Sequence, residues 1–223
     1  MAMLVYGSTL SPYVRKCMVF GAEKGLELRL KFVGPGSPDP EFREISPFGK
    51  MPGFRDGDFT ISDSTAIVTY LDAKFPEPNL IPLAPEARAR TIWFDELADT
   101  LMMAAAGVVF GNRFVKPRVM QLPCDHAAAD QAENEQLPPI FAYLERTIPD
   151  SGFLVEDRFT LADISVTSPL ATLGCIGVCV DPQRYPRTAA YVEAIHARPS
   201  FAAILERDRA QVAAMGGGID RAA

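Results

Sequence analysis

The sequence contains few of the residues that bind transition metals. Its 223 residues include two histidines and four cysteines, and no two cysteines form a CxxC pair. Structural zinc sites need four such ligands, usually in closely spaced pairs, so we expect no metal site. Cys17 lies inside a helical pattern, and Cys175 and Cys179 are four residues apart. We expect the last two to share a helix face as small buried side chains.

The sequence also lacks an excess of positive charge. It has 22 Lys and Arg against 28 Asp and Glu, a net charge of −6. Proteins that bind nucleic acid normally present a basic face, so we expect no nucleic-acid partner. An anionic ligand would need donors supplied locally, because the overall field repels it.

No apolar run is long enough to cross a membrane, and no signal-peptide pattern is present. With 48% hydrophobic and 22% charged residues, the composition is that of a globular protein. Thiols without pairing motifs are typical of reducing compartments. We therefore expect a cytoplasmic protein without a membrane partner.

The first residues alternate between strand and helix patterns. Residues 3–6 are a short apolar run that predicts a buried strand. Ser11-Pro12 then reads as the N-cap and first residue of a helix, which Gly25 ends. Residues 26–32 alternate leucine or phenylalanine with charged residues, which predicts a strand with one buried face. Strand, helix and strand in this order favour a parallel βαβ unit.

The next segment predicts a short helix over 41–46, a hairpin and another helix. Asp56-Gly57 is a strong hairpin dipeptide. The helix that follows begins near Asp63-Ser64 and stops at Pro76. Four prolines between residues 76 and 85 indicate a stiff linker. We predict a first domain of residues 1–77, a linker of 78–85 and a second domain of 86–223.

Everything after the linker has helical patterns. Further helices are predicted over 127–148, 159–173, 184–197 and 200–214, and Pro138-Pro139 is expected to kink or break the first of these. The glycine-rich tail from residue 216 is expected to be disordered. An earlier helix is predicted by apolar residues at helical spacing: Trp93, Leu97, Leu101, Ala104 and Val108.

Thr160 and Asp163 form a capping-box pattern before an apolar run. Thr160 can cap the helix, and Asp163 can return a hydrogen bond to it. Phe159 and Ile164 occupy the hydrophobic-staple positions. We assign this motif a structural role in starting the helix, and no catalytic role.

Four motifs, in this order, resemble the cytosolic glutathione S-transferase family. They are SPYV at 11–14, SPFGKMP at 46–52, ISDSTAIVTYL at 61–71 and FTLADISV at 159–166. Glutaredoxin-type relatives carry CPYC where this chain has SPYV. The resemblance implies the glutathione transferase fold, an α/β thioredoxin-like N-terminal domain plus an all-α C-terminal helical domain. It also implies a homodimer that joins the N-terminal domain of one subunit to the C-terminal domain of the other.

The resemblance further implies that glutathione binds to the first domain. The Met51-Pro52 bond would be cis, with the Met51 backbone pairing with the cysteinyl unit like an added strand. Lys50 would meet the glycyl carboxylate. Asp63 would accept from the ammonium, and Ser64 would bind the γ-glutamyl carboxylate at a helix N-terminus. The alternatives are a trans turn proline, a solvated lysine and a pair that only caps the helix.

Glutathione brings its own thiol, and that thiol must ionise to react. A free thiol has a pKa near ~8.5, and lowering it to about 6.5 takes ~2.7 kcal/mol. A hydroxyl hydrogen bond to an anion offers roughly 1.5–3 kcal/mol, and a helix N-terminus adds about 0.3–1 kcal/mol. Ser11 is our candidate donor, against the alternative of an ordinary N-cap serine. Ser8, Thr9 and Tyr6 are rivals.

The hydrophobic electrophile would bind in an apolar cleft. Candidate residues are Tyr13, Met103, Phe110 and Phe114, each of which could instead belong to the core. The leading interpretation is a detoxification enzyme in which glutathione thiolate attacks a hydrophobic electrophile. A glutathione-dependent isomerase or peroxidase on the same fold, and a non-catalytic protein that binds glutathione or apolar ligands, remain alternatives.

Overall fold

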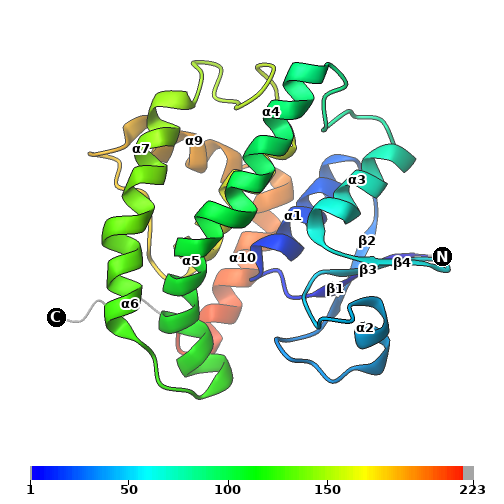
Figure 1. Ribbon diagram of the computed structural model, residues 1–223, viewed down its shortest axis with the longest axis horizontal. Coiled ribbons are helices and arrows are strands. Elements are labelled where there is room, and N and C mark those ends of the chain that lie inside the picture. The colour runs from blue at the N-terminus through cyan, green and yellow to red at the C-terminus, as the bar shows by residue number, and fades with distance from the viewer. Residues whose placement is uncertain (1, 218–223) are drawn as a thin grey trace. The chain divides into compact units, whose positions relative to one another are not determined.

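The computed structural model describes residues 2–217, and its internal contacts divide the chain into two units (Figure 1). The first unit extends to Arg88 and the second begins at Ala89, so the division falls inside helix α4 (Pro85–Glu96). The tail from residue 216 is predicted to be disordered. Residues 218–223 lie outside the described residues, so the prediction is not tested there. Gly217 still donates a hydrogen bond from its N–H to the carbonyl of Val212 at 2.9 Å.

The first unit is built on a mixed four-stranded sheet. The strands are β1 (Met3–Gly7), β2 (Leu28–Phe32), β3 (Gly53–Asp56) and β4 (Phe59–Ser62). Their order across the sheet is β2-β1-β3-β4, with β1 and β2 parallel and the other pairs antiparallel. The predicted βαβ unit and the hairpin at Asp56-Gly57 are therefore confirmed.

Helices cover both faces of this sheet. Helices α1 (Pro12–Glu23) and α3 (Ser64–Lys74) lie together on one face, and the short α2 (Pro40–Ile45) lies on the other (Figure 1). The α2 face has its own buried cluster of Tyr6, Val33, Phe42 and Ile45. Proline at the first position of α1 and of α2 supplies a preset helical φ where no N–H partner is needed.

The prediction of a buried apolar face on residues 26–32 is wrong. Leu30 is 37% exposed and Phe32 is 66% exposed. The reason is position, because β2 is an edge strand of the sheet. A Cβ added to Gly21 of α1 would lie 2.3 Å from a methyl of Leu28, so α1 contacts the strand there.

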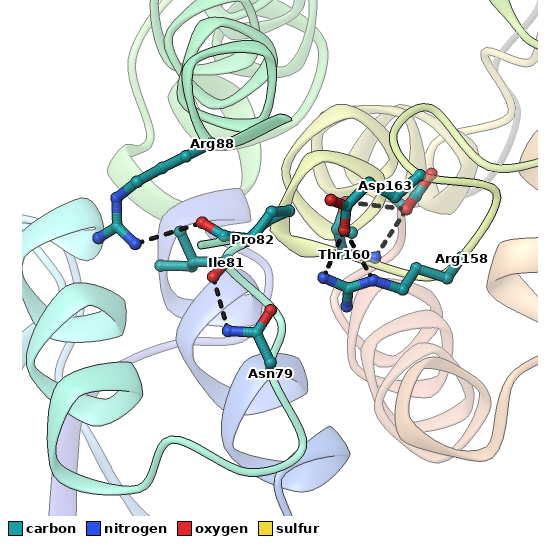
Figure 2. Close-up of polar contacts among 8 residues, drawn as sticks. Asn79, Ile81, Pro82, Arg88, Arg158, Thr160 and Asp163 are labelled. Carbon is teal, nitrogen blue, oxygen red and sulfur yellow. Dashed lines mark hydrogen bonds and ion pairs between the residues drawn. The ribbon is translucent and has the colours of Figure 1, made fainter. Parts of the chain in front are cut away.

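Polar contacts hold the proline-rich segment against the first unit. The buried Lys24 donates from Nζ to the carbonyls of Phe75 and Pro78 at 2.7 and 2.8 Å. Asn79 donates from its side chain to the carbonyl of Ile81 at 2.7 Å (Figure 2). These hydrogen bonds fix the segment in place, and its prolines stiffen it.

The second unit is all helical. One long run comprises α4, η1 (Leu97–Met102), α5 (Met103–Phe110) and η2 (Gly111–Met120), in which η marks π-helical turns. Helix α8 (Leu161–Cys175) packs against α5 and η1 and is buried along almost its whole length. The last two helices of the chain that the structure describes are α9 (Pro186–His196) and α10 (Pro199–Ala214).

Of the kink or break predicted at Pro138-Pro139, the break does not occur. Helical backbone continues from α6 (His126–Gln131) through η3 (Ala132–Gln136) into α7 (Leu137–Thr147). The prolines lie in the first turn of α7, where a missing N–H costs least. The hydrogen-bond pattern changes to π-helical immediately before them, as it does at many helix irregularities.

The capping box of α8 forms as predicted (Figure 2). The N–H and hydroxyl of Thr160 donate to the Asp163 carboxylate at 2.9 and 3.3 Å. Phe159 and Ile164, the staple pair, are both buried. This arrangement satisfies donors that the first helical turn would otherwise leave without partners.

The expectation for Cys175 and Cys179 is wrong. Cys175 is the last residue of α8 and is half-buried, whereas Cys179 lies beyond the helix and is exposed. The helix ends at Ile176-Gly177, so the four-residue spacing no longer places both on one face. Within residues 2–217 no group of three or more His, Cys, Asp or Glu side chains could hold a metal ion. No helix in this range is long and apolar enough to span a bilayer.

Candidate functional site

Three stretches of the first unit converge at the end of β1. Because β1 pairs with β3, Tyr6 lies opposite Gly53, and the chain just before β3 passes close to Gly7. A Cβ on Gly7 would lie 3.4 Å from that of Met51 and 2.4 Å from a methyl of Val14. Gly7 also has a φ of +154°, so only glycine allows this close approach.

Contacts between α1 and α3 bring in the third stretch. Lys16 Nζ donates to the hydroxyl of Thr65 at 3.3 Å, and Cys17 Sγ lies 3.8 Å from the carbonyl oxygen of Ser64. The N-terminus of α3 is therefore held beside the first turns of α1. The end of β1 thus lies beside Met51, and α1 lies beside the start of α3 at Ser64-Thr65.

Ser11 occupies the N-cap position of α1 in an extended conformation. Its N–H donates to the carbonyl of Ser8 and its own carbonyl accepts from the N–H of Arg15, both at 2.9 Å. Its side chain is half-buried and, among the described residues, makes no capping hydrogen bond. The hydroxyl of an ordinary N-cap serine accepts a hydrogen bond from a backbone N–H of the helix. The Ser11 hydroxyl makes no such bond and is therefore available to a ligand.

The three rivals differ in their surroundings. Ser8 is half-buried and Thr9 is buried. Tyr6 is fully buried in the cluster beneath α2, with Lys31 Nζ 5.1 Å from its ring centroid. Burial, together with the nearby Glu41 carboxylate, raises the pKa of Tyr6. A buried phenol in these surroundings is poorly placed to stabilise an anion.

The loop before β3 is ordered by Ser46, a residue that the sequence analysis did not single out. Its hydroxyl donates to the carbonyl of Lys50 at 2.6 Å and accepts from the Lys50 N–H at 3.0 Å. The Met51-Pro52 bond that follows is cis, as predicted. Met51 is half-buried, and the side chain of Lys50 is exposed. A serine four residues before the lysine is the only sequence signal for this loop closure.

Asp63 begins α3 with an unusual backbone. Its φ is +88°, a region that L-residues rarely adopt and that tends to occur at functional sites. Its carboxylate accepts from the N–H of Ala66 at 3.0 Å, so the capping function is real. Ser64, the first residue of the helix, is buried. Its position places it at the positive end of α3, where anions bind readily.

The residues predicted for the electrophile site have different environments. In the first unit, Tyr13 is half-buried. In the second unit Met103 and Phe110 are half-buried, and Phe114 is only 1% exposed. Phe110 and Phe114 stack with their ring centroids 5.2 Å apart. Phe114 therefore has the burial of a core residue, which supports the alternative interpretation for that position.

Both halves of the chain match family models. Residues 5–79 match the model described as Glutathione S-transferase, N-terminal domain, and residues 119–208 match Glutathione S-transferase, C-terminal domain. The chain belongs to the glutathione S-transferase family. The family assignment and the thioredoxin-like plus all-helical fold are thereby confirmed.

Relatives of this family member have several names. Glutathione S-transferase 3 of Zea mays is 29% identical, with coverage of 88% of this chain and 90% of the relative. The Stringent starvation protein A homolog of Coxiella burnetii is 26% identical, with 94% of each chain covered. A glutathione S-transferase structure from Sinorhizobium meliloti superposes with a TM-score of 0.85 at 20% identity, covering 92% and 93%.

Proposed function

We propose that the protein is a glutathione transferase that activates the glutathione thiol for attack on a hydrophobic electrophile. The observation that carries this proposal is the Ser11 hydroxyl. It stands at the N-terminus of α1 and is not used as a cap. The loop that contains it starts at Gly7, which lies close to Met51, and the helix that it begins contacts the start of α3.

The chemistry follows from these positions. The thiolate is the nucleophile, and at neutral pH a free thiol is only a few per cent ionised. The hydroxyl of Ser11 donates to the sulfur anion, and the N-terminus of α1 adds its positive potential. Together they supply about 2–4 kcal/mol of preferential thiolate stabilisation, enough to ionise most of the bound thiol near neutral pH.

The remaining residues hold the tripeptide in place. Met51 pairs its backbone with the cysteinyl unit, and Lys50 meets the glycyl carboxylate. Ser64 binds the γ-glutamyl carboxylate at the start of α3, and Asp63 accepts from the ammonium group. The positive φ of Asp63 supports this role, because a strained backbone at a helix start usually serves a ligand.

The decisive experiment is Ser11→Ala, with Ser8→Ala and Thr9→Ala as matched controls in the same loop. We expect Ser11→Ala to lower turnover with 1-chloro-2,4-dinitrobenzene by ten-fold or more, since a hydrogen bond to an anion is worth roughly 1.5–3 kcal/mol. Titration of the bound thiol by its ultraviolet absorbance should show a higher pKa in this variant. Full turnover in Ser11→Ala together with a loss in a control would move the role to that control residue.

A non-catalytic glutathione-binding protein is the second candidate. It is favoured by the Stringent starvation protein A homolog, a relative whose name states no transferase activity. This relative is similar over 94% of this chain. One set of measurements distinguishes the two functions. Binding to immobilised glutathione without conjugation, isomerase or peroxidase activity on any of a panel of substrates would select the second candidate.

A further inference from the structure

A cysteine and a histidine outside the proposed glutathione site lie in direct contact. Cys124 Sγ is 3.0 Å from Nε2 of His126. Cys124 lies in the segment that joins η2 to α6, and His126 is the first residue of α6, in the second unit. Neither has a role in the proposed transferase chemistry.

The backbone explains why these two side chains meet. Asp125, between them, is extended, with φ −101° and ψ 94°. In an extended chain, residues two apart point to the same side. The spacing C-x-H therefore places thiol and imidazole together as soon as the residue between them is held extended.

Asp125 is held at both its backbone and its side chain. Its carboxylate accepts from the N–H of Ala128 at 3.0 Å, and its N–H donates to the side-chain oxygen of Asn112 at 2.9 Å. Asn112 is buried and is itself fixed by donating to the carbonyl of Val108 at 3.0 Å. The Cys124–His126 pair thus stands on a fixed support, as a functional pair requires.

Two cations of η2 near this segment have partners other than Cys124 and His126. Arg113 pairs with both Asp130 and Glu133, and Lys116 donates to the side chain of Asn112 at 2.7 Å. His126 is therefore the group placed to take a proton from the thiol. The charged residues of the elements packed here are Arg113, Lys116 and Arg118 of η2, Asp125 and Asp130 at α6, and Glu133 and Glu135 of η3.

We propose that Cys124 is a site of thiol–disulfide exchange with small disulfides such as glutathione disulfide, and that His126, in contact with its sulfur, accepts the thiol proton. The proton passes from Sγ to Nε2. The Cys124 thiolate then attacks one sulfur of the disulfide, forming a mixed disulfide and breaking the original S–S bond. The released glutathione thiolate takes the proton from His126, so atoms and charge balance.

The other cysteines provide the internal control. Cys17 is buried, whereas Cys179 is exposed and more accessible than the half-buried Cys124. Exposure alone predicts that Cys179 reacts faster. Pairing with His126 predicts the reverse, because at about pH 6.5 an unassisted thiol is only ~1% thiolate.

The test compares two full-length proteins, each with one accessible thiol. Cys175→Ser with Cys179→Ser leaves Cys124, and Cys124→Ser with Cys175→Ser leaves Cys179. At about pH 6.5 we expect Cys124 to react with 5,5′-dithiobis(2-nitrobenzoate) faster than Cys179, by about ten-fold or more.

His126→Gln in the Cys124 protein keeps the side-chain size and a hydrogen-bond donor but cannot take the proton. It should lower the rate to that of Cys179. Incubation with glutathione disulfide should place one glutathionyl group on the peptide that contains Cys124. Equal rates for the two thiols, or an unchanged rate in His126→Gln, would overturn the proposal. Because neither assay involves conjugation of glutathione to a substrate, these outcomes are independent of the role of Ser11.

Discussion

At the residue scale, Asp163 combines burial with several hydrogen bonds. It accepts from the N–H groups of Leu154 and Thr160 at 3.0 and 2.9 Å, and from the hydroxyl of Tyr191 at 3.0 Å. Burial raises the pKa of Asp163, while these hydrogen bonds act in the opposite direction. Burial and the neighbouring carboxylate together raise the pKa of the Tyr191 phenol well above its usual value.

The capping box gives a prediction at this scale. Thr160→Ala should lower the free energy of unfolding by about 1 kcal/mol. Asp163→Ala should lower it by about 2–4 kcal/mol, because it strands several buried donors. Urea denaturation measures both. Turnover per folded molecule should stay unchanged, and a catalytic loss without destabilisation would contradict a structural role.

Ser11 and Ser46 are two residues of the candidate site that the sequence predicted to different extents. The sequence alone identified Ser11 as a helix cap or a thiol activator without choosing between them. The structure shows, for the chain it describes, that this hydroxyl does not cap α1, which favours the second interpretation. Ser46 was missed, because its hydrogen bonds to Lys50 depend on how the loop folds back.

At the scale of elements, one charged cluster joins the β3–β4 hairpin to α3. Asp56, at the end of β3, accepts from Lys74 and, at 2.9 Å, from the hydroxyl of Tyr70. The hydrogen bond from Lys74 is the main reason why the pKa of Asp56 is lowered. Phe59 of β4 stacks on Tyr70 with ring centroids 4.4 Å apart, so the contact has an apolar half as well.

This cluster predicts a specific acid sensitivity. Because the folded-state pKa of Asp56 lies below its unfolded value, the stabilisation is present above the unfolded pKa and is lost as pH falls through the folded one. Urea unfolding between about pH 5 and pH 3 should therefore show a steeper loss for the natural protein than for Asp56→Asn. Equal slopes would show that the cluster contributes nothing.

At the scale of the whole molecule, each unit has large apolar residues that are exposed. Phe48, in the first unit, is 87% exposed. In the second unit Trp93 and Leu101, which recur at helical spacing, are 48% and 61% exposed. The family resemblance implies a dimer in which the first domain of one copy meets the second domain of the other. These residues are suited to such a pairing, because isolated apolar side chains gain by mutual burial.

We predict that Phe48→Ser and Leu101→Ser each shift a dimer towards monomer. Leu83→Ser is the matched control, because Leu83 is also 79% exposed but lies in the proline-rich segment. Light scattering coupled to size-exclusion chromatography gives the mass of each variant over a range of concentrations. A monomeric natural protein, or equal effects of all three substitutions, would contradict the predicted pairing.

The sequence by itself determined most elements and their order, because these depend on local chemistry. Periodicity, helix caps, a hairpin dipeptide and prolines act within a few residues, and the family motifs occur in the same order as the elements. Tertiary structure alone decided features that depend on distant neighbours. Leu30 and Phe32 are exposed because β2 lies at the edge of the sheet. Cys124 meets His126 because Asn112 on another element holds the residue between them.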